Sequence, residues 1–416
     1  MTHNAPSAAP SLSPASALEK RPRPLIVSSA PSAGRLIGID PARGLAVFGM
    51  YAAHVGPDPE VGGPLGFVLE LARGRSSALF ALLAGFSLVL ITGRPQPRTG
   101  RAGRQAVGRV VIRSVVLITL GFALTALDTD VDVILAFYGL IFLAVLPLYR
   151  MRAATLVVIA AASALVMPQV LYVIRQWIHD GDWTDTVIGW DPLARIGDTD
   201  GVIELLFTGE YPVLTWMPFM IAGMAVARLN LTQVRVRTRL ALTGGGLAVL
   251  GYGGSWLALT LVPNARATIA ASTDGDSGAS AWWSDTVGYL IDDPAPAAWL
   301  LVGAPHSQTT FSILGNTGVG LVVVAACVAA TARMPRFTRL ATPVSAVGMI
   351  SLTAYVLHVL AIYVVGMEEE TFPALIALLA FLAIAMLFAT LWTRYFRRGP
   401  LEHVLHATAQ VARRIK

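Results

Sequence analysis

Charged residues are scarce in this sequence of 416 residues. Asp, Glu, Lys and Arg make up 13% of it, whereas soluble domains usually carry about 25%. Hydrophobic residues make up 55%, and they fall in long uninterrupted blocks. A helix needs about 20 apolar residues to cross a bilayer. The natural surroundings of most of the surface are therefore lipid, and an ordinary soluble domain is excluded.

Cysteine and several catalytic motifs are also missing. The single cysteine, Cys327, excludes a disulfide framework and a cysteine-based metal site. The sequence has no glycine-rich phosphate loop followed by lysine, and no strand–turn–helix elbow for a nucleophilic serine. These absences argue against nucleotide-driven chemistry and against a serine hydrolase.

Residues 1–34 are rich in Ser, Ala and Pro and show no sustained periodicity. Lys20, Arg21 and Arg23 precede only a short apolar stretch, too short for a signal peptide. We expect a disordered cytoplasmic tail, with a twin-arginine or other export signal as the alternative.

Apolar stretches after this tail predict about ten transmembrane helices in an all-α, polytopic membrane protein. The candidate spans are 36–55, 76–93, 111–127, 131–149, 153–173, 212–228, 240–262, 309–332, 343–365 and 372–392. The first is the weakest, because Asp40 and Arg43 interrupt its inner end.

The distribution of charge supports this count. With both termini in the cytoplasm, 26 of 31 basic residues fall on the cytoplasmic side and 22 of 25 acidic residues on the outer side. Lys and Arg mark cytoplasmic loops in membrane proteins, and here they alternate without a reversal. The basic pI near 9.7 is therefore an orientation signal. We expect membrane lipid as a partner and no nucleic acid.

Ionisable residues at membrane depth are costly and usually face a cavity or a partner. Asp40 and Arg43 stand three residues apart, so they share a helix face and can pair. One interpretation is an orientation anchor with a snorkelling arginine. The other is that Arg43 faces an anionic group entering from the cytoplasm.

Three histidines are predicted at similar outer depths on three different spans. His54 follows Arg43 in the first span, His306 lies just outside the eighth, and His358 lies in the outer part of the ninth; Asn316 is about two turns into the eighth. Histidine can exchange a proton near neutral pH or act as a nucleophile. The alternative is that they are packing or interface residues. No metal is expected, because no acid is placed to join them.

Two outer segments, 174–211 and 263–308, are long and rich in Asp, Gly and Trp. Their tryptophans suit interfacial anchoring. Loops this long are also often functional, so a lid or a platform that stacks on a sugar ring is the second interpretation.

Several stretches resemble known families. Residues 35–47, with Met50 and His54, and residues 75–87 resemble the first two spans of heparan-α-glucosaminide N-acetyltransferase-like proteins. The C-terminal half is similar to the YeiB-like family of bacterial membrane proteins. The matching pieces there are 211–212, 216–218, 223–228, 305–307, 348–355 with His358, and 398–402.

The resemblance implies a membrane acyltransferase in the bacterial plasma (inner) membrane. It implies transfer of an acyl group, expected to be acetyl, from cytoplasmic acyl-CoA to an envelope glycan or small-molecule acceptor on the far side. His54 matches the family's catalytic candidate, and His306 and His358 are its rivals. Asn316 or an arginine would donate to the oxyanion. Asp40, Arg43, Arg113 and Arg228 are then expected at the donor site.

The same resemblance divides the chain into four parts. Residues 1–34 form the tail, 35–230 the acyltransferase-like half, 231–402 the YeiB-like half, and 403–416 a basic cytoplasmic tail. A homo-oligomer is neither required nor excluded.

Two other classes of function stay open. A transporter or flippase of a small or lipid-linked solute would also need buried polar residues and broken helices. Glycines at 244–246, 251–254 and 315–318 suit such breaks. The other alternative is a non-catalytic membrane scaffold.

Overall fold

The computed structural model describes residues 38–179, 181, 183–197, 199–273, 279–284, 295–366 and 373–415. Within these ranges the chain folds into helices joined by turns, and no strand occurs. The all-α fold class is therefore confirmed. The predicted tail, residues 1–34, lies outside the described residues. The described residues belong to one compact unit.

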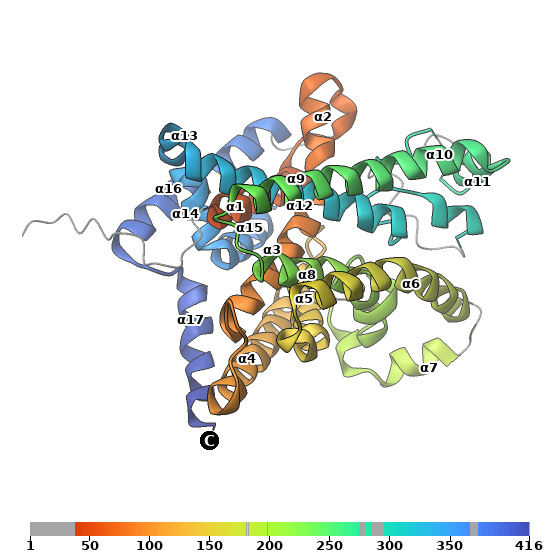
Figure 1. Cartoon of the computed structure of the whole chain (residues 1–416). Coiled ribbons are helices and arrows are strands. Elements are labelled where there is room, and N and C mark those ends of the chain that lie inside the picture. The colour runs from red at the N-terminus through yellow and green to blue at the C-terminus, as the bar shows by residue number, and fades with distance from the viewer. Residues whose placement is uncertain are drawn as a thin grey trace, which may run out of the picture. The chain divides into compact units, whose positions relative to one another are not determined.

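Each of the ten predicted stretches contains a helix (Figure 1). The principal helices are α1 (Ile39–Val55), α2 (Gly63–Ala72), α3 (Arg75–Thr92), α4 (Gly100–Thr125), α5 (Ile134–Val145), α6 (Ala153–His179), α8 (Val213–Ala227), α9 (Val234–Ala248), α10 (Gly254–Leu261), α12 (Thr310–Arg333), α14 (Thr342–Met349), α15 (Ser351–Val365) and α16 (Ala374–Tyr395). Shorter helices are α7 (Trp183–Trp190), α11 (Ala265–Ala271), α13 (Pro335–Leu340) and α17 (Pro400–Ala409).

Length and composition identify a multi-pass membrane protein. Among the described helices, five are long and apolar enough to cross a membrane, and seven if each of two bent pairs counts as one span. Helix α8, and α5 with its continuation to Arg150, are apolar but shorter. The count of ten and the cytoplasmic position of both termini stay predictions.

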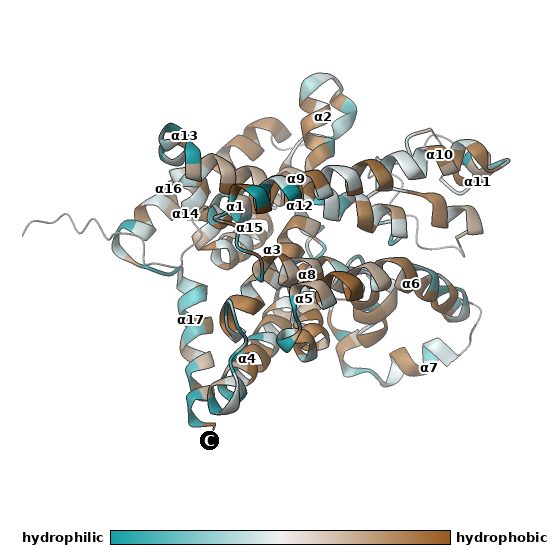
Figure 2. Cartoon of the chain, in the orientation of Figure 1, coloured by the Kyte–Doolittle hydropathy of each residue, from teal (hydrophilic) through white to brown (hydrophobic). Residues whose placement is uncertain are grey.

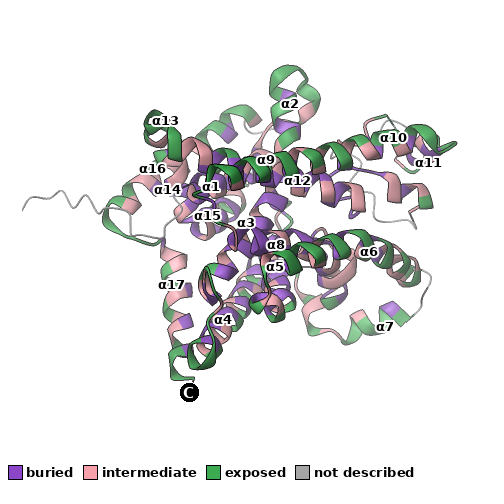
Figure 3. Ribbon diagram, in the orientation of Figure 1, coloured by how far each residue is buried: buried purple, intermediate pink, exposed green. Residues whose placement is uncertain are grey.

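Helix α3 lies at the centre of the bundle, and α6 and α16 lie at its edge. Gly63–Thr92 covers α2 and α3, and 67% of the residues in its most apolar stretch are buried. In the corresponding stretch of α16, only 11% of the residues are buried. Figure 2 shows hydrophobic residues along α6, and Figure 3 shows much of that helix exposed. An apolar surface without protein cover fits contact with lipid. A helix that is apolar all round, such as α3, belongs in the interior.

Glycines allow α3 and α8 to pack closely. A Cβ atom at Gly85 would collide with the carbonyl group of Met220, and one at Gly223 with that of Leu82. Small residues at such crossings let helix backbones approach in membranes. Helix α1 packs against α3, α12 and α14. This arrangement holds α1, which carries several predicted site residues, in the interior.

The ninth predicted span is broken. Helices α14 and α15 meet at 86°, with Ile350 between them. Glu402 caps the start of α15: its carboxylate accepts hydrogen bonds from the N–H groups of Leu352 at 2.8 Å and Thr353 at 3.2 Å. A carboxylate is favourable at a helix N-terminus, where free N–H groups and the helix dipole converge.

The glycine-containing stretches do not break their helices in the way that the transporter interpretation predicts. The chain stays helical through 244–246 and forms a π-helical turn at Val249–Gly253 before α10. The sharp bend, 98°, comes later, between Leu261 and Ala265. Gly315 and Gly318 lie inside an unbroken α12.

Candidate functional site

His54 and His358 form a hydrogen-bonded pair. His54 lies in the last turn of α1 and His358 lies in α15. Their Nδ1 and Nε2 atoms are 2.9 Å apart, and the rings stack with centroids 5.1 Å apart. One nitrogen must carry the proton and the other must accept it. His54 is partly exposed and His358 is only 2% exposed. Such a pair can offer His54 as a base that His358 orients.

Two tyrosines enclose the His358 ring. The ring centroids of Tyr51 and Tyr355 lie 4.7 Å and 4.9 Å from it. Tyr51 donates its hydroxyl proton to the carbonyl of Ala354 at 2.8 Å, and the hydroxyl of Tyr355 accepts from the Ile134 N–H at 3.2 Å. The sequence analysis missed both. Their spacing was a signal, because each stands three residues before a histidine and so shares its helix face.

His306 lies in a buried segment, residues 302–309. Its Nδ1 atom is 3.1 Å from the Glu210 carboxylate. The backbone of His306 has φ of 62°, a left-handed conformation uncommon outside glycine. Gly74 makes room for it: φ is 61° there, and an added Cβ would lie 2.8 Å from His306 Cδ2. Conformations of this kind persist where the surrounding structure enforces them, often at functional sites.

Acidic side chains from two loops lie near His306. Asp132, just before α5, interacts electrostatically with Glu210 and His306. Loss of water around the Asp132 carboxyl, together with the nearby Glu210, raises its pKa to about 6. His306 also lies near enough to His54 for their charges to interact. The three predicted histidines therefore lie in one region, together with Glu210 and Asp132. The sequence analysis did not name these two acidic residues as candidates.

Asn316 belongs to a neighbouring network. Its Oδ1 accepts from the Tyr252 hydroxyl at 2.7 Å, and its Nδ2 donates to Ser312 Oγ at 3.2 Å. Tyr252 in turn accepts from Nε of Arg75 at 3.0 Å, and Arg75 is only 3% exposed. These contacts tie Asn316 to Arg75. Its part as an oxyanion donor stays a prediction.

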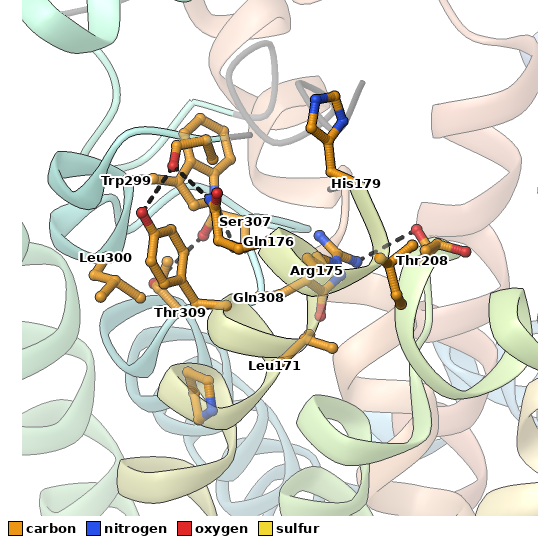
Figure 4. A pocket seen from close by; sticks show the side chains of 14 residues that line it. Leu171, Arg175, Gln176, His179, Thr208, Trp299, Leu300, Ser307, Gln308 and Thr309 are labelled. Atoms are coloured by element: carbon orange, nitrogen blue, oxygen red, sulfur yellow. Dashed lines mark hydrogen bonds between the residues drawn. The ribbon is translucent and has the colours of Figure 1, made fainter. Parts of the chain in front are cut away.

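A small polar cavity of about 130 Å³ lies beside the His306 segment (Figure 4). Ser307, Gln308 and Thr309 line it together with Arg175 and Gln176 of α6. Gln308 accepts from the Thr215 hydroxyl at 2.7 Å and donates to the Glu210 carbonyl at 2.9 Å. Hydroxyl and amide groups around a cavity suit a ligand rich in hydroxyl groups.

The other end of α1 holds a second polar cavity, of about 180 Å³. Arg43 donates to Ser87 Oγ at 2.9 Å and lies 3.7 Å from Asp40. Arg113 lines the same cavity and interacts electrostatically with Glu402 and Arg43. Among the described residues, it makes no hydrogen bond or ion pair. Two arginines here can receive phosphate groups.

Arg228 is separate from this cavity. It donates to the carbonyl oxygens of Gly93 at 2.6 Å and Pro95 at 3.2 Å, and also to that of Tyr149. These bonds connect α8 to the loop after α3 and to the end of the α5 segment. The structure thus brings Arg43, Arg113 and Asp40 together and uses Arg228 as a clamp between helices.

The described part of the chain contains no group of three or more His, Cys, Asp or Glu side chains arranged to hold a metal ion.

A family model described as "Heparan-alpha-glucosaminide N-acetyltransferase, catalytic" matches residues 35–252. A second, described as "Protein of unknown function (DUF418)", matches residues 280–412. No curated protein matches the chain. The first match contains His54 and Arg43, and the second contains His306 and His358, so both resemblances are confirmed.

Proposed function

The chain belongs to the heparan-α-glucosaminide N-acetyltransferase-like family, and we propose that it transfers an acyl group from acyl-CoA to an acceptor across the membrane. The donor binds from the cytoplasm, and acetyl is the expected group. The acceptor is an amine or hydroxyl of an envelope glycan or small molecule on the outer face of a bacterial plasma membrane. Ten spans and cytoplasmic termini are part of this proposal.

The observation that carries the proposal is the placement of two polar sites at the two ends of α1. Arg43 lies in the arginine-lined cavity at one end, and His54 lies in the histidine pair at the other. Eleven residues separate them, which corresponds to about 16 Å along a helix. The arginines would hold the CoA phosphates while the thioester reaches the histidines.

The reaction follows from the hydrogen bond between the rings. In this mechanism the Nδ1–H of His54 donates a hydrogen bond to Nε2 of His358, so Nε2 of His54 is unprotonated and can act as a base. This nitrogen takes a proton from the acceptor as the acceptor attacks the thioester carbonyl. The tetrahedral intermediate collapses, the C–S bond breaks, and His54 returns the proton to the leaving thiolate. In the alternative mechanism, His54 itself attacks the thioester, carries the acyl group and then passes it to the acceptor.

Purified protein in lipid nanodiscs tests the proposal. We expect acetyl-CoA to bind, and CoA to be released when glucosamine is added as acceptor. His54→Asn should bind acetyl-CoA normally and lose release about 10²- to 10⁴-fold, the usual contribution of general acid–base catalysis. His403→Asn is the matched control, since His403 is exposed on α17. Wild-type protein that neither binds nor turns over acyl-CoA would contradict the proposal.

A transporter or flippase is the second candidate. The 86° break between α14 and α15 favours it, because broken helices line the substrate sites of many transporters. Such a protein needs no acyl-CoA. Solute movement in liposomes without any CoA release would support it over the acyltransferase.

A further inference from the structure

We propose that the acceptor is lipid-linked, and that its hydrocarbon tail lies in an apolar groove between α15 and α16 that ends at the histidine pair. This inference rests on the proposed function and names the class of its acceptor. The groove has a volume of about 290 Å³. His358 and Tyr51 line it, so it borders the same ring that His54 contacts.

The lining of the groove suits hydrocarbon. Apart from His358 and Tyr51, its side chains are aliphatic or phenyl groups without polar atoms. The Tyr51 hydroxyl already donates to Ala354. A polar ligand would lose its hydrogen bonds to water here without replacement, which is costly. A hydrocarbon chain makes no hydrogen bonds and so would lose none on entering the groove.

The groove also faces the lipid side of the protein. Leu357 and Ile384, which line it, are 43% and 66% exposed. Helix α16 lies at the edge of the bundle, and α15 also leaves apolar side chains such as Val364 uncovered by protein. A lipid tail can therefore enter sideways from the bilayer, without passing through water.

Length and direction fit one leaflet. The lining residues run from Ile350, at the start of α15, to Ala361 within it, which is about 16 Å of helix. This is roughly half of the 30 Å hydrocarbon core. His358 lies toward the outer end of this stretch in the proposed topology. A lipid of the outer leaflet would thus place its head group near His54, His306 and Glu210, and its tail in the groove.

The donor already has a different cavity. The cavity with Arg43 and Arg113 is lined from α1, α3, α4, α5, the α14–α15 junction and α17, and it shares no lining residue with the groove. Arg43, Arg113 and Glu402 give this cavity charged side chains, whereas the groove has no Asp, Glu, Lys or Arg side chain. Two cavities of opposite character fit two substrates, a charged CoA thioester and an acceptor held by its tail.

Photolabelling of the full chain in nanodiscs tests the inference. The probe is a dodecyl glucosaminide with a diazirine in its alkyl tail. We expect saturable labelling of residues 381–388, which excess dodecyl glucosaminide removes and excess glucosamine does not. Ala385→Trp fills the groove and should lower this labelling tenfold or more. Ala380→Trp, at an exposed position of α16 outside the groove, is the matched control and should label like wild type.

Two outcomes would overturn the inference. One is labelling that excess dodecyl glucosaminide does not reduce, which would mean bulk lipid only. The other is labelling of the same segment by a diazirine-tailed acyl-CoA that competes with the glucosaminide, which would assign the groove to the donor chain. Release of CoA by the wild type with glucosamine or dodecyl glucosaminide reports separately on the proposed function. Without any release, that function fails even if the groove binds the probe.

Discussion

Replacing His358 with leucine separates the two histidines by role. In the wild type, Nδ1 of His54 and Nε2 of His358 are 2.9 Å apart. Leucine cannot accept the Nδ1 proton, so His54 loses the partner that fixes its tautomer. A net hydrogen bond is worth about 0.5–1.5 kcal/mol, and about 1.4 kcal/mol corresponds to tenfold in rate. We expect a loss of roughly twofold to tenfold in kcat, with KM for acetyl-CoA unchanged.

His358→Gln is the matched rescue variant. A glutamine carbonyl can accept the same proton, so its kcat should lie above that of His358→Leu. His54→Asn should be far worse than either, by about 10²-fold or more. The assay is transfer of labelled acetyl from acetyl-CoA to glucosamine in nanodiscs, at several pH values. If His358→Leu is as inactive as His54→Asn, or worse, His358 is the base and our reading of the hydrogen bond is wrong.

Three further predictions concern the donor site, the outer acid and the topology. Arg43→Gln should weaken acetyl-CoA binding about tenfold or more, since a charge-assisted contact is worth ~1.5–3 kcal/mol. Arg228→Gln should instead lower thermal stability. Calorimetry with both variants distinguishes the two effects. The folded-state pKa of Asp132, about 6, lies above its unfolded value, so its ionised form costs stability. Asp132→Asn should therefore raise the melting temperature above pH 6 and leave it unchanged below pH 4; the same gain at both pH values would refute the assignment. Cysteines at positions 100 and 235 should be protected from impermeant reagents in intact cells, whereas ones at 185 and 276 should react; outside labelling of position 235 would overturn the topology.

The helices were predictable because their signals are local. In lipid, each backbone polar group must be satisfied within its own helix, so a run of apolar residues predicts a span without knowledge of its neighbours. The pairing of Asp40 with Arg43 was predictable for the same reason, since i and i+3 share a helix face. The family resemblance was carried by short strings around Arg43, His54, His306 and His358.

The break at Ile350 was not predictable. The new helix that starts there is capped by Glu402, which lies 50 residues from Leu352 in the sequence. Without that carboxylate, residues 343–365 look like one continuous span. The different roles of Arg113 and Arg228 were hidden as well, because both stand at the inner ends of predicted helices.

The sequence by itself determined the class of protein and the family. Only the tertiary structure decided which of the polar residues meet. His54 and His358 are separated by 304 residues, and their contact depends on how α1 and α15 are rotated about their axes. Successive residues turn by about 100° around a helix, so an error of one position points a side chain at lipid instead of at a partner. That rotation is set by packing between helices, at close contacts such as Gly85 with Met220, and no local pattern encodes it.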